Sequence, residues 1–210
     1  MKAHRSDVVF GAALIGVGAL LLLGNLGLIG HLATLIWSFL FALGGILFLV
    51  TFFTGRGDWW ELIPASAMFG LSLVTGLNAL LPWASGWLSG AAFLGMLGLG
   101  FWAVYLASRH NWWAVIPGGT LLTLAAVVAA PEVSGYRDIP GVLFLGLAAT
   151  FGLVYILPTP YGRNTWAAIP AIVLLGIGTV ISFSAWGYVW PGALILVGLS
   201  QIYHGVRRTP

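Results

Sequence analysis

The sequence predicts an all-α fold: a polytopic membrane bundle of about eight transmembrane helices, arranged as four tandem hairpins that repeat in parallel. Two observations lead to this prediction. Hydrophobic residues make up 60% of the 210 residues and charged residues only 6%, whereas a soluble domain carries about 25% charged residues to keep its surface wet. A short motif also recurs at a fixed interval, which is typical of a chain built from copies of one supersecondary unit.

Eight apolar runs, each bounded by Gly, Pro, Asn or charged residues, define the expected helices. Most have about 17 to 22 residues, which is enough to cross a hydrocarbon layer of roughly 30 Å. The stretches between them are too short for a soluble domain, so one membrane domain is expected. The expected helices cover residues 8–24, 33–53, 60–80, 86–107, 112–130, 139–157, 165–184 and 188–206.

A recurring motif marks the start of three of these helices. It reads DWWELIP over residues 58–64, NWWAVIP over 111–117 and NTWAAIP over 164–170, so successive copies begin 53 residues apart (111 − 58 and 164 − 111). The same interval before the first copy leads to residues 5–11, where Gly11 replaces the proline. The second half of each unit opens at Trp37, Trp87, Ile139 or Trp190, with Gly45, Gly95, Leu147 or Gly198 eight positions later.

An interval of about 50 residues that contains two helices indicates an array of hairpins whose copies pack against one another. The predicted hairpins cover residues 1–57, 58–110, 111–163 and 164–210. Because each copy contains two crossings, successive copies enter the membrane in the same direction, unlike the inverted repeats of many transporters.

Basic residues predict the orientation. Arg137 alone falls on one side of the predicted bundle, and the others fall on the side of the two termini. Cytoplasmic loops carry an excess of such residues, so both termini are expected in the cytoplasm. The residues on this side are Lys2, Arg5, Arg56, Arg109, Arg163, Arg207 and Arg208.

The first apolar run also has the outline of a secretory signal peptide, because Lys2 and Arg5 precede it. No A-x-A-like cleavage site follows in residues 24–30, and the repeat makes this run equivalent to helices further along the chain. It is therefore interpreted as the first transmembrane helix.

The first residue of each motif copy is suited to begin a helix. The side-chain oxygens of Asp58, Asn111 and Asn164 can accept hydrogen bonds from the free N–H groups of a first turn. Asp58 and Glu61 also have the spacing of a capping box. The neighbouring tryptophans suit the headgroup level of a bilayer, where the indole ring is buried and its N–H stays hydrated.

Each proline of the motif removes one backbone donor and frees the carbonyl of Trp60, Trp113 or Trp166, four residues earlier. One interpretation is a ring of loosened helix ends that forms a site for lipid headgroups or a partner on the cytoplasmic side. The favoured interpretation is a repeated anchor and bend that shapes the bundle. The expected interface anchors and helix starts are Asp58, Trp59, Trp60, Pro64, Asn111, Trp112, Trp113, Pro117, Asn164, Trp166 and Pro170.

Small residues four positions apart predict close helix packing, because they let two backbones approach each other. Cofactor grooves also use such faces, but packing is the favoured interpretation. The pairs are Ala12 with Gly16, Ser66 with Gly70, Gly86 with Gly90 and Ala148 with Gly152.

The sequence offers little for catalysis. Every charged residue lies at a helix end or in a loop, which argues against a pump or an ion-coupled transporter. The chain has no cysteine, and His4, His31, His110 and His204 are peripheral, with no carboxylate at a ligand spacing. We therefore expect no catalytic residue, no metal and no cofactor. The scattered basic residues also argue against nucleic-acid binding.

Two polar features remain open. The run Gly70-Leu71-Ser72-Leu73 resembles the surroundings of an intramembrane protease serine, but no span contains a histidine to act as its base, so Ser72 is interpreted as a packing residue. Asn25 and Asn78, at equivalent helix ends, either frame a polar vestibule or cap their helices, with C-capping the simpler account. The other polar residues at or near spans are Thr75, Thr120, Thr123, Thr179, Ser182 and Ser184.

The first hairpin resembles the transmembrane region of the LiaI/LiaF-type family, which has a glycine-bearing helix, an Asn-x-Gly turn and a helix led by tryptophan. A weaker resemblance links the chain to the HdeD-like membrane proteins, which are also built from tandem hairpins. These resemblances imply a bacterial inner-membrane protein, and some LiaI/LiaF-type members act in cell-envelope stress. The soluble carboxyl-terminal part of the longer members has no counterpart here. The matching residues are Gly11, Leu14, Ile15, Gly16, Leu22, Asn25, Leu26, Gly27, Trp37 and Gly44, and Trp190-Pro191-Gly192 through Gly198.

We therefore expect a non-enzymatic bacterial membrane protein that acts through helix-helix contacts, as an envelope-stress or accessory subunit of a membrane complex. Its expected partners are membrane lipid and another membrane protein or a second copy of the chain. The alternative is a channel or carrier for a small neutral solute or lipid. A continuous cavity lined by the polar residues above would favour this alternative, and a fully packed axis would exclude it.

Overall fold

The computed structural model describes residues 30–55, 58–134, 140–160 and 162–182, with short pieces that include 14–19 and 194–198. The chain divides into two compact units, Met1–Gly100 and Phe101–Pro210, and the boundary falls within one helix. In these described ranges every regular element is helical, apart from an isolated bridge between Thr159 and Gly162. The all-α prediction is confirmed for this part of the chain.

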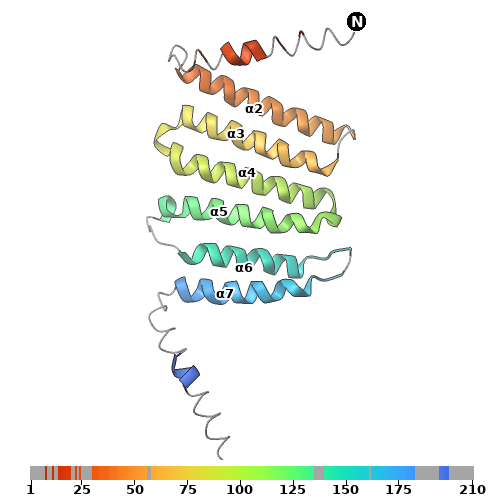
Figure 1. The fold of residues 1–210 in the computed structure, drawn as a ribbon, viewed down its shortest axis with the longest axis vertical. Helices are drawn as coiled ribbons and strands as arrows, with labels where there is room; N and C mark the ends of the chain where they lie inside the picture. The colour runs from red at the N-terminus through yellow and green to blue at the C-terminus, as the bar shows by residue number, and fades with distance from the viewer. Residues whose placement is uncertain are drawn as a thin grey trace, which may run out of the picture. The chain divides into compact units, whose positions relative to one another are not determined.

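The first unit contains the helices α2 (Gly30–Phe53) and α3 (Leu62–Leu80) and most of α4 (Ser85–Ala107) (Figure 1). Short 3-10 turns precede α3 and α4: η1 at Trp59–Glu61 and η2 at Pro82–Ala84. Helix α3 lies between α2 and α4, antiparallel to both. Both neighbours approach it through glycine or small hydroxyl residues, as described below.

The second unit begins with the last residues of α4, from Phe101. It continues through the 3-10 turn η3 (Arg109–Ala114), α5 (Val115–Ser134), α6 (Pro140–Ile156), the 3-10 turn η4 (Thr165–Ala167) and α7 (Ala168–Ser182). Helix α6 lies between α5 and α7 and packs against both (Figure 1). The starts of α5 and α7 therefore lie at the same end of this unit, beside the carboxyl end of α6.

The described residues include five helices that are long and apolar enough to cross a membrane. These are Leu32–Phe53, Trp59–Leu80, Gly86–Ala107, Arg109–Pro131 and Thr165–Ser182, and Gly141–Ile156 is a shorter apolar helix. Many large apolar side chains are exposed on them, as expected for surfaces that face lipid rather than water. The fold is that of a helical membrane protein.

Six of the expected helices match observed ones, with ends that differ by no more than four residues: 33–53, 60–80, 86–107, 112–130, 139–157 and 165–184. The other two, 8–24 and 188–206, lie largely outside the described residues. The described pieces 14–19 and 194–198 are helical.

Close helix contacts in the first unit involve glycine on one helix and a larger side chain on the next. A Cβ at Gly70 of α3 would lie 2.8 Å from the ring of Phe93 of α4, and one at Gly100 would overlap Ser66. Between α2 and α3, the Ser38 hydroxyl donates to the Ser72 carbonyl at 2.8 Å. The prediction that Ser66 and Gly70 mark a close contact is confirmed, and Ser72 lies in a helix contact.

The contact between α5 and α6 is reciprocal. Thr150 of α6 fills the space beside Gly119 of α5, and Thr123 of α5 fills the space beside Gly146 of α6, so that a Cβ on either glycine would overlap a threonine. Each hydroxyl donates to a carbonyl of its own helix, Thr123 to Gly119 at 2.8 Å and Thr150 to Gly146 at 2.9 Å. The threonines therefore satisfy their polar groups locally while their bulk packs against the neighbouring helix.

The close-packing prediction is wrong at two of the expected glycines. A Cβ at Gly86 or Gly152 would meet no atom within 4 Å. The spacing of small residues could not predict this. It shows that they share a helix face, but it does not show which helix, if any, packs on that face. The prediction for Ala12 and Gly16 lies partly outside the described residues and stays a prediction.

Candidate functional site

The three copies of the repeated motif form the same backbone structure. Each copy contains the end of a 3-10 turn, at Glu61, Ala114 or Ala167, and the next residue begins an α-helix. The first helical residues, Leu62, Val115 and Ala168, have φ of −64°, −62° and −64°. The same local structure thus recurs at 53-residue steps (115 − 62 and 168 − 115). We call these three segments, 58–64, 108–117 and 163–170, the helix-start junctions.

The expected side-chain caps are not formed. Asp58 and Asn164 do occupy the N-cap positions of η1 and η4, but neither side chain makes a capping hydrogen bond. Their backbone carbonyls accept instead, from the N–H groups of Glu61 at 3.2 Å and Ala167 at 3.1 Å. A 3-10 turn explains the difference, because its i→i+3 bonds already satisfy the donors that a side chain would cap.

Two further details of the capping prediction are wrong. Ser108, not Asn111, is the N-cap residue of η3, and Asn111 lies within the turn with a non-helical φ of −85° and ψ of 41°. The carboxylate of Glu61 does not complete a capping box with Asp58. It accepts a hydrogen bond from the Thr51 hydroxyl of α2 at 2.8 Å.

The prolines begin their helices rather than bend them. Pro64, Pro117 and Pro170 are each the third residue of an α-helix, where the missing N–H has no partner in the helix to lose. The carbonyls that were expected to be free accept from the first helical N–H groups, as Trp60 does from Leu62. Trp113 and Trp166 accept in the same way. The less favoured interpretation, that of loosened helix ends, is therefore wrong for these carbonyls: the junctions are ordered turns.

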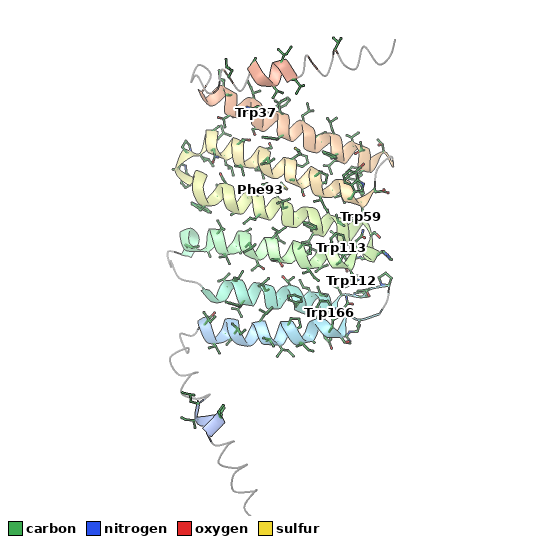
Figure 2. The ribbon with its side chains drawn as sticks, in the orientation of Figure 1. Trp37, Trp59, Phe93, Trp112, Trp113 and Trp166 are labelled. Atoms are coloured by element: carbon green, nitrogen blue, oxygen red, sulfur yellow. The ribbon has the colours of Figure 1, made fainter. Side chains whose placement is uncertain are left out.

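The tryptophans of the junctions are partly exposed. Figure 2 shows Trp112, Trp113 and Trp166 at the same end of the second unit, where α5 and α7 begin. Trp113 packs edge-on against Phe101 of α4, with ring centroids 6.3 Å apart, and Trp166 packs against Phe151 of α6 at 6.1 Å. Trp59 and Trp60 are exposed at the start of α3. The role of these residues as interface anchors stays a prediction.

The junctions differ in charge. The first contains Asp58 and Glu61, whereas the other two have Asn and Ala at the same positions. In the second unit each junction instead places an arginine over a tyrosine ring. The guanidinium of Arg109 lies 4.5 Å from the ring centroid of Tyr105, and that of Arg163 lies 4.7 Å from that of Tyr155.

The tyrosines of these cation-π pairs were not singled out from the sequence, where the arginines serve only as topology signals. Tyr105 lies four residues before Arg109, a helical spacing that could have indicated the first pair. The second pair offers no such signal, because residues 157–164 connect α6 to η4 between Tyr155 and the turn.

Several polar atoms at the junctions of the second unit are buried without a hydrogen-bond partner. They include the Nδ2 atoms of Asn111 and Asn164, the hydroxyl of Tyr105 and the Nε1 atom of Trp102. Asn111 is only 5% exposed. Buried donors of this kind usually have a partner, so these four atoms are exceptions among the described residues.

Asn78 does not cap α3, and its part in a polar vestibule stays a prediction. Its Oδ1 atom accepts a hydrogen bond from Ser89 of α4 at 2.8 Å, and the end of α3 is closed by the bond from Leu81 N–H to the Leu77 carbonyl. Its predicted counterpart Asn25 lies outside the described residues. The hydroxyls of Thr75, Thr120, Thr123 and Thr179 each donate to a carbonyl of their own helix.

Within the described residues, no three His, Asp or Glu side chains lie close enough to hold a metal ion. Comparison of the chain with models of protein families, with curated proteins and with solved structures gives no match. The resemblance to LiaI/LiaF-type and HdeD-like proteins therefore stays a prediction from the residues that carry it.

Proposed function

We propose that this chain is a non-enzymatic, multi-pass protein of the bacterial inner membrane that works by packing its helices against those of a membrane partner, either another protein or a second copy. In this proposal it serves as an accessory or envelope-stress subunit. The observation that carries the proposal is that the polar residues in the spans serve helix packing. Thr123 and Thr150 satisfy their hydroxyls on their own helices and pack on glycines of the neighbouring helix.

The helix-start junctions support the repeat that belongs to this proposal. Three helices begin with the same 3-10 turn and proline at 53-residue steps, which is the behaviour of one unit copied along the chain. We propose that the copies are four hairpins with eight crossings, and that both termini lie in the cytoplasm beside the junction arginines.

The outer face of α2 supports a role in contacts with other helices. Phe39, Ile46 and Phe53 are exposed on it, and the opposite face packs on α3. A corresponding run of exposed apolar residues, which includes Ile172 and Val173, lies on α7. In a bilayer such faces are covered by lipid or by another helix, which is either the chain's own first or last predicted span or a helix of a partner. Close packing rather than hydrophobicity selects the helix.

Site-specific photocrosslinking in intact membranes tests this proposal. A crosslinking residue at Phe39 of α2 and another at Val173 of α7 are expected to form discrete adducts with a second protein chain. The same residue at Thr54, which is exposed beyond the end of α2, serves as the control and is expected to form none. Adducts at neither apolar face, together with a monomer mass in mild detergent, would contradict the proposal.

A further inference from the structure

An apolar groove of about 360 Å³ lies between α6 and α7. This volume falls in the range of roughly 300–1,000 Å³ found for small-molecule sites. The lining residues include Leu145, Ala148 and Gly152 of α6 and Ala171, Ile172 and Leu175 of α7. Ile172 and Leu175 are more than half exposed, so the groove opens on the surface of these two helices.

The groove leads toward a cation. Ala148, Gly152 and Tyr155 follow one another at spacings of four and three residues, which places them along one face of α6. Tyr155 is about 4.5 Å further along the helix axis than Gly152, and its ring carries the guanidinium of Arg163 at 4.7 Å. An apolar channel is therefore followed, one helical turn later, by an exposed positive charge.

The backbone around Arg163 is fixed. Gly162 adopts a φ of 100°, which favours glycine, and its N–H donates to the Thr159 carbonyl at 3.1 Å. The carbonyl of Arg163 accepts from the Thr165 N–H at 3.0 Å. The turn thus places the arginine beside the start of α7, next to Asn164, whose buried Nδ2 atom has no hydrogen-bond partner.

No carboxylate is near in sequence to balance this charge. From residue 101 to the end of the chain the only acidic residues are Glu132 and Asp138. Both precede α6 in the chain, whereas Arg163 follows it.

We infer that the groove between α6 and α7 binds one anionic phospholipid, with an acyl chain along Ala148, Gly152 and Ala171 and the headgroup phosphate at Arg163. The shape matches a lipid because the apolar and cationic parts follow one another along the helix axis, as chain and headgroup do across a leaflet. This inference requires only that the helices lie in a bilayer, and it is independent of the protein partner proposed above.

Native mass spectrometry of the purified chain from neutral detergent tests the inference, with phosphatidylglycerol and phosphatidylcholine offered at equal concentration. The wild-type chain is expected to retain phosphatidylglycerol preferentially. Arg163→Gln is expected to weaken that retention about fivefold, the effect of one basic residue near an anionic lipid surface. Arg163→Lys keeps the charge and is expected to preserve most of it.

A second pair of variants tests the contribution of the acyl-chain groove separately from that of the arginine charge. Gly152→Leu places a side chain in the groove, where a Cβ meets no atom within 4 Å, and is expected to reduce retention of the lipid at least as much as Arg163→Gln. Gly176→Leu, at an equally open glycine of α7 that does not line the groove, is the matched control and is expected to retain the lipid. Arg137→Gln controls for net charge.

Three results would overturn the inference. They are equal retention of the two lipids by the wild-type chain, unchanged retention in both Arg163→Gln and Gly152→Leu, and displacement of the lipid by millimolar inorganic phosphate, which would identify a simple anion site. Arg163 is exposed in a loop, so its variant keeps the test decisive even if Gly152→Leu does not fold.

Discussion

The two sides of α6 use glycine in opposite ways. On the side toward α5, Gly146 lies against Thr123, and any added side chain would overlap that threonine. On the side toward α7, Gly152 lies six residues further along (152 − 146) and faces open space that forms part of the groove. One glycine therefore allows two backbones to approach, and the other leaves room for something that is not part of the chain.

The difference teaches that small residues in a membrane helix report two kinds of surface. Where a neighbouring helix supplies a side chain that fills the space, the glycine belongs to a protein contact. Where it does not, the glycine leaves a gap, which at Gly152 is the groove that we propose for lipid. A groove of about 300 Å³ also follows the α5 side, but its floor contains the interlocked Gly119, Thr123, Gly146 and Thr150.

The largest expected effect is at Gly146. Gly146→Leu should push α5 and α6 apart and lower the free energy of unfolding by about 1–3 kcal/mol or more, whereas Gly152→Leu should leave it within about 0.5 kcal/mol. Reversible unfolding in mixed micelles, followed by circular dichroism, measures both. Equal losses at the two glycines would break the distinction between the two sides of α6.

A second pair sharpens the comparison on α7 and has a smaller effect. A Cβ at Gly178 would lie 2.9–3.0 Å from side-chain atoms and the backbone nitrogen of Leu145 of α6. A Cβ at Gly176 would meet no atom within 4 Å. Gly178→Ala is expected to destabilise by about 1 kcal/mol. Gly176→Ala should stabilise by about 0.5–1 kcal/mol, because alanine has less backbone freedom to lose in a helix. If both variants were stabilised, α6 and α7 would be no closer at Gly178 than at the groove.

The smallest expected effect concerns the hydroxyls on the α5 side. Thr123→Val keeps the shape that fills the space beside Gly146 and removes only a hydrogen bond to its own helix. The expected loss is below about 0.6 kcal/mol, the average for polar contacts between membrane helices, because this hydrogen bond stays within one helix. A loss above about 2 kcal/mol in the same unfolding experiment would mean that the hydroxyl, not the methyl group, holds the helices together.

The sequence predicts the helices well because their signal is local. The apolar runs and their Gly, Pro and Asn boundaries lie within each helix, and α2 through α7 begin and end close to the expected residues. The 53-residue motif also predicts that α3, α5 and α7 begin alike. The predicted side-chain cap at Asp58 was wrong. The same residues can begin a 3-10 turn or an α-helix, and in a 3-10 turn the backbone N–H groups find backbone acceptors three residues earlier.

The contacts between helices could not be predicted in the same way. Pairs of small residues led to Gly152 as a packing site, although its neighbour on α7 leaves it open. The reciprocal contacts of Gly119 and Gly146 escaped notice because their partners are threonines on another helix. The pairing of Arg163 with Tyr155 depends on the path of a loop between them, which no spacing rule describes.

Accessibility of single cysteines in intact cells tests the central claim most directly, since the chain has no cysteine of its own. The chosen positions are exposed: Thr54, His110 and Pro160 at the junction ends of their helices, and Trp83 in the turn before α4. An impermeant maleimide should label Trp83→Cys from outside and should label the other three only after lysis. Labelling of His110→Cys and Pro160→Cys from opposite sides of the membrane would contradict the account.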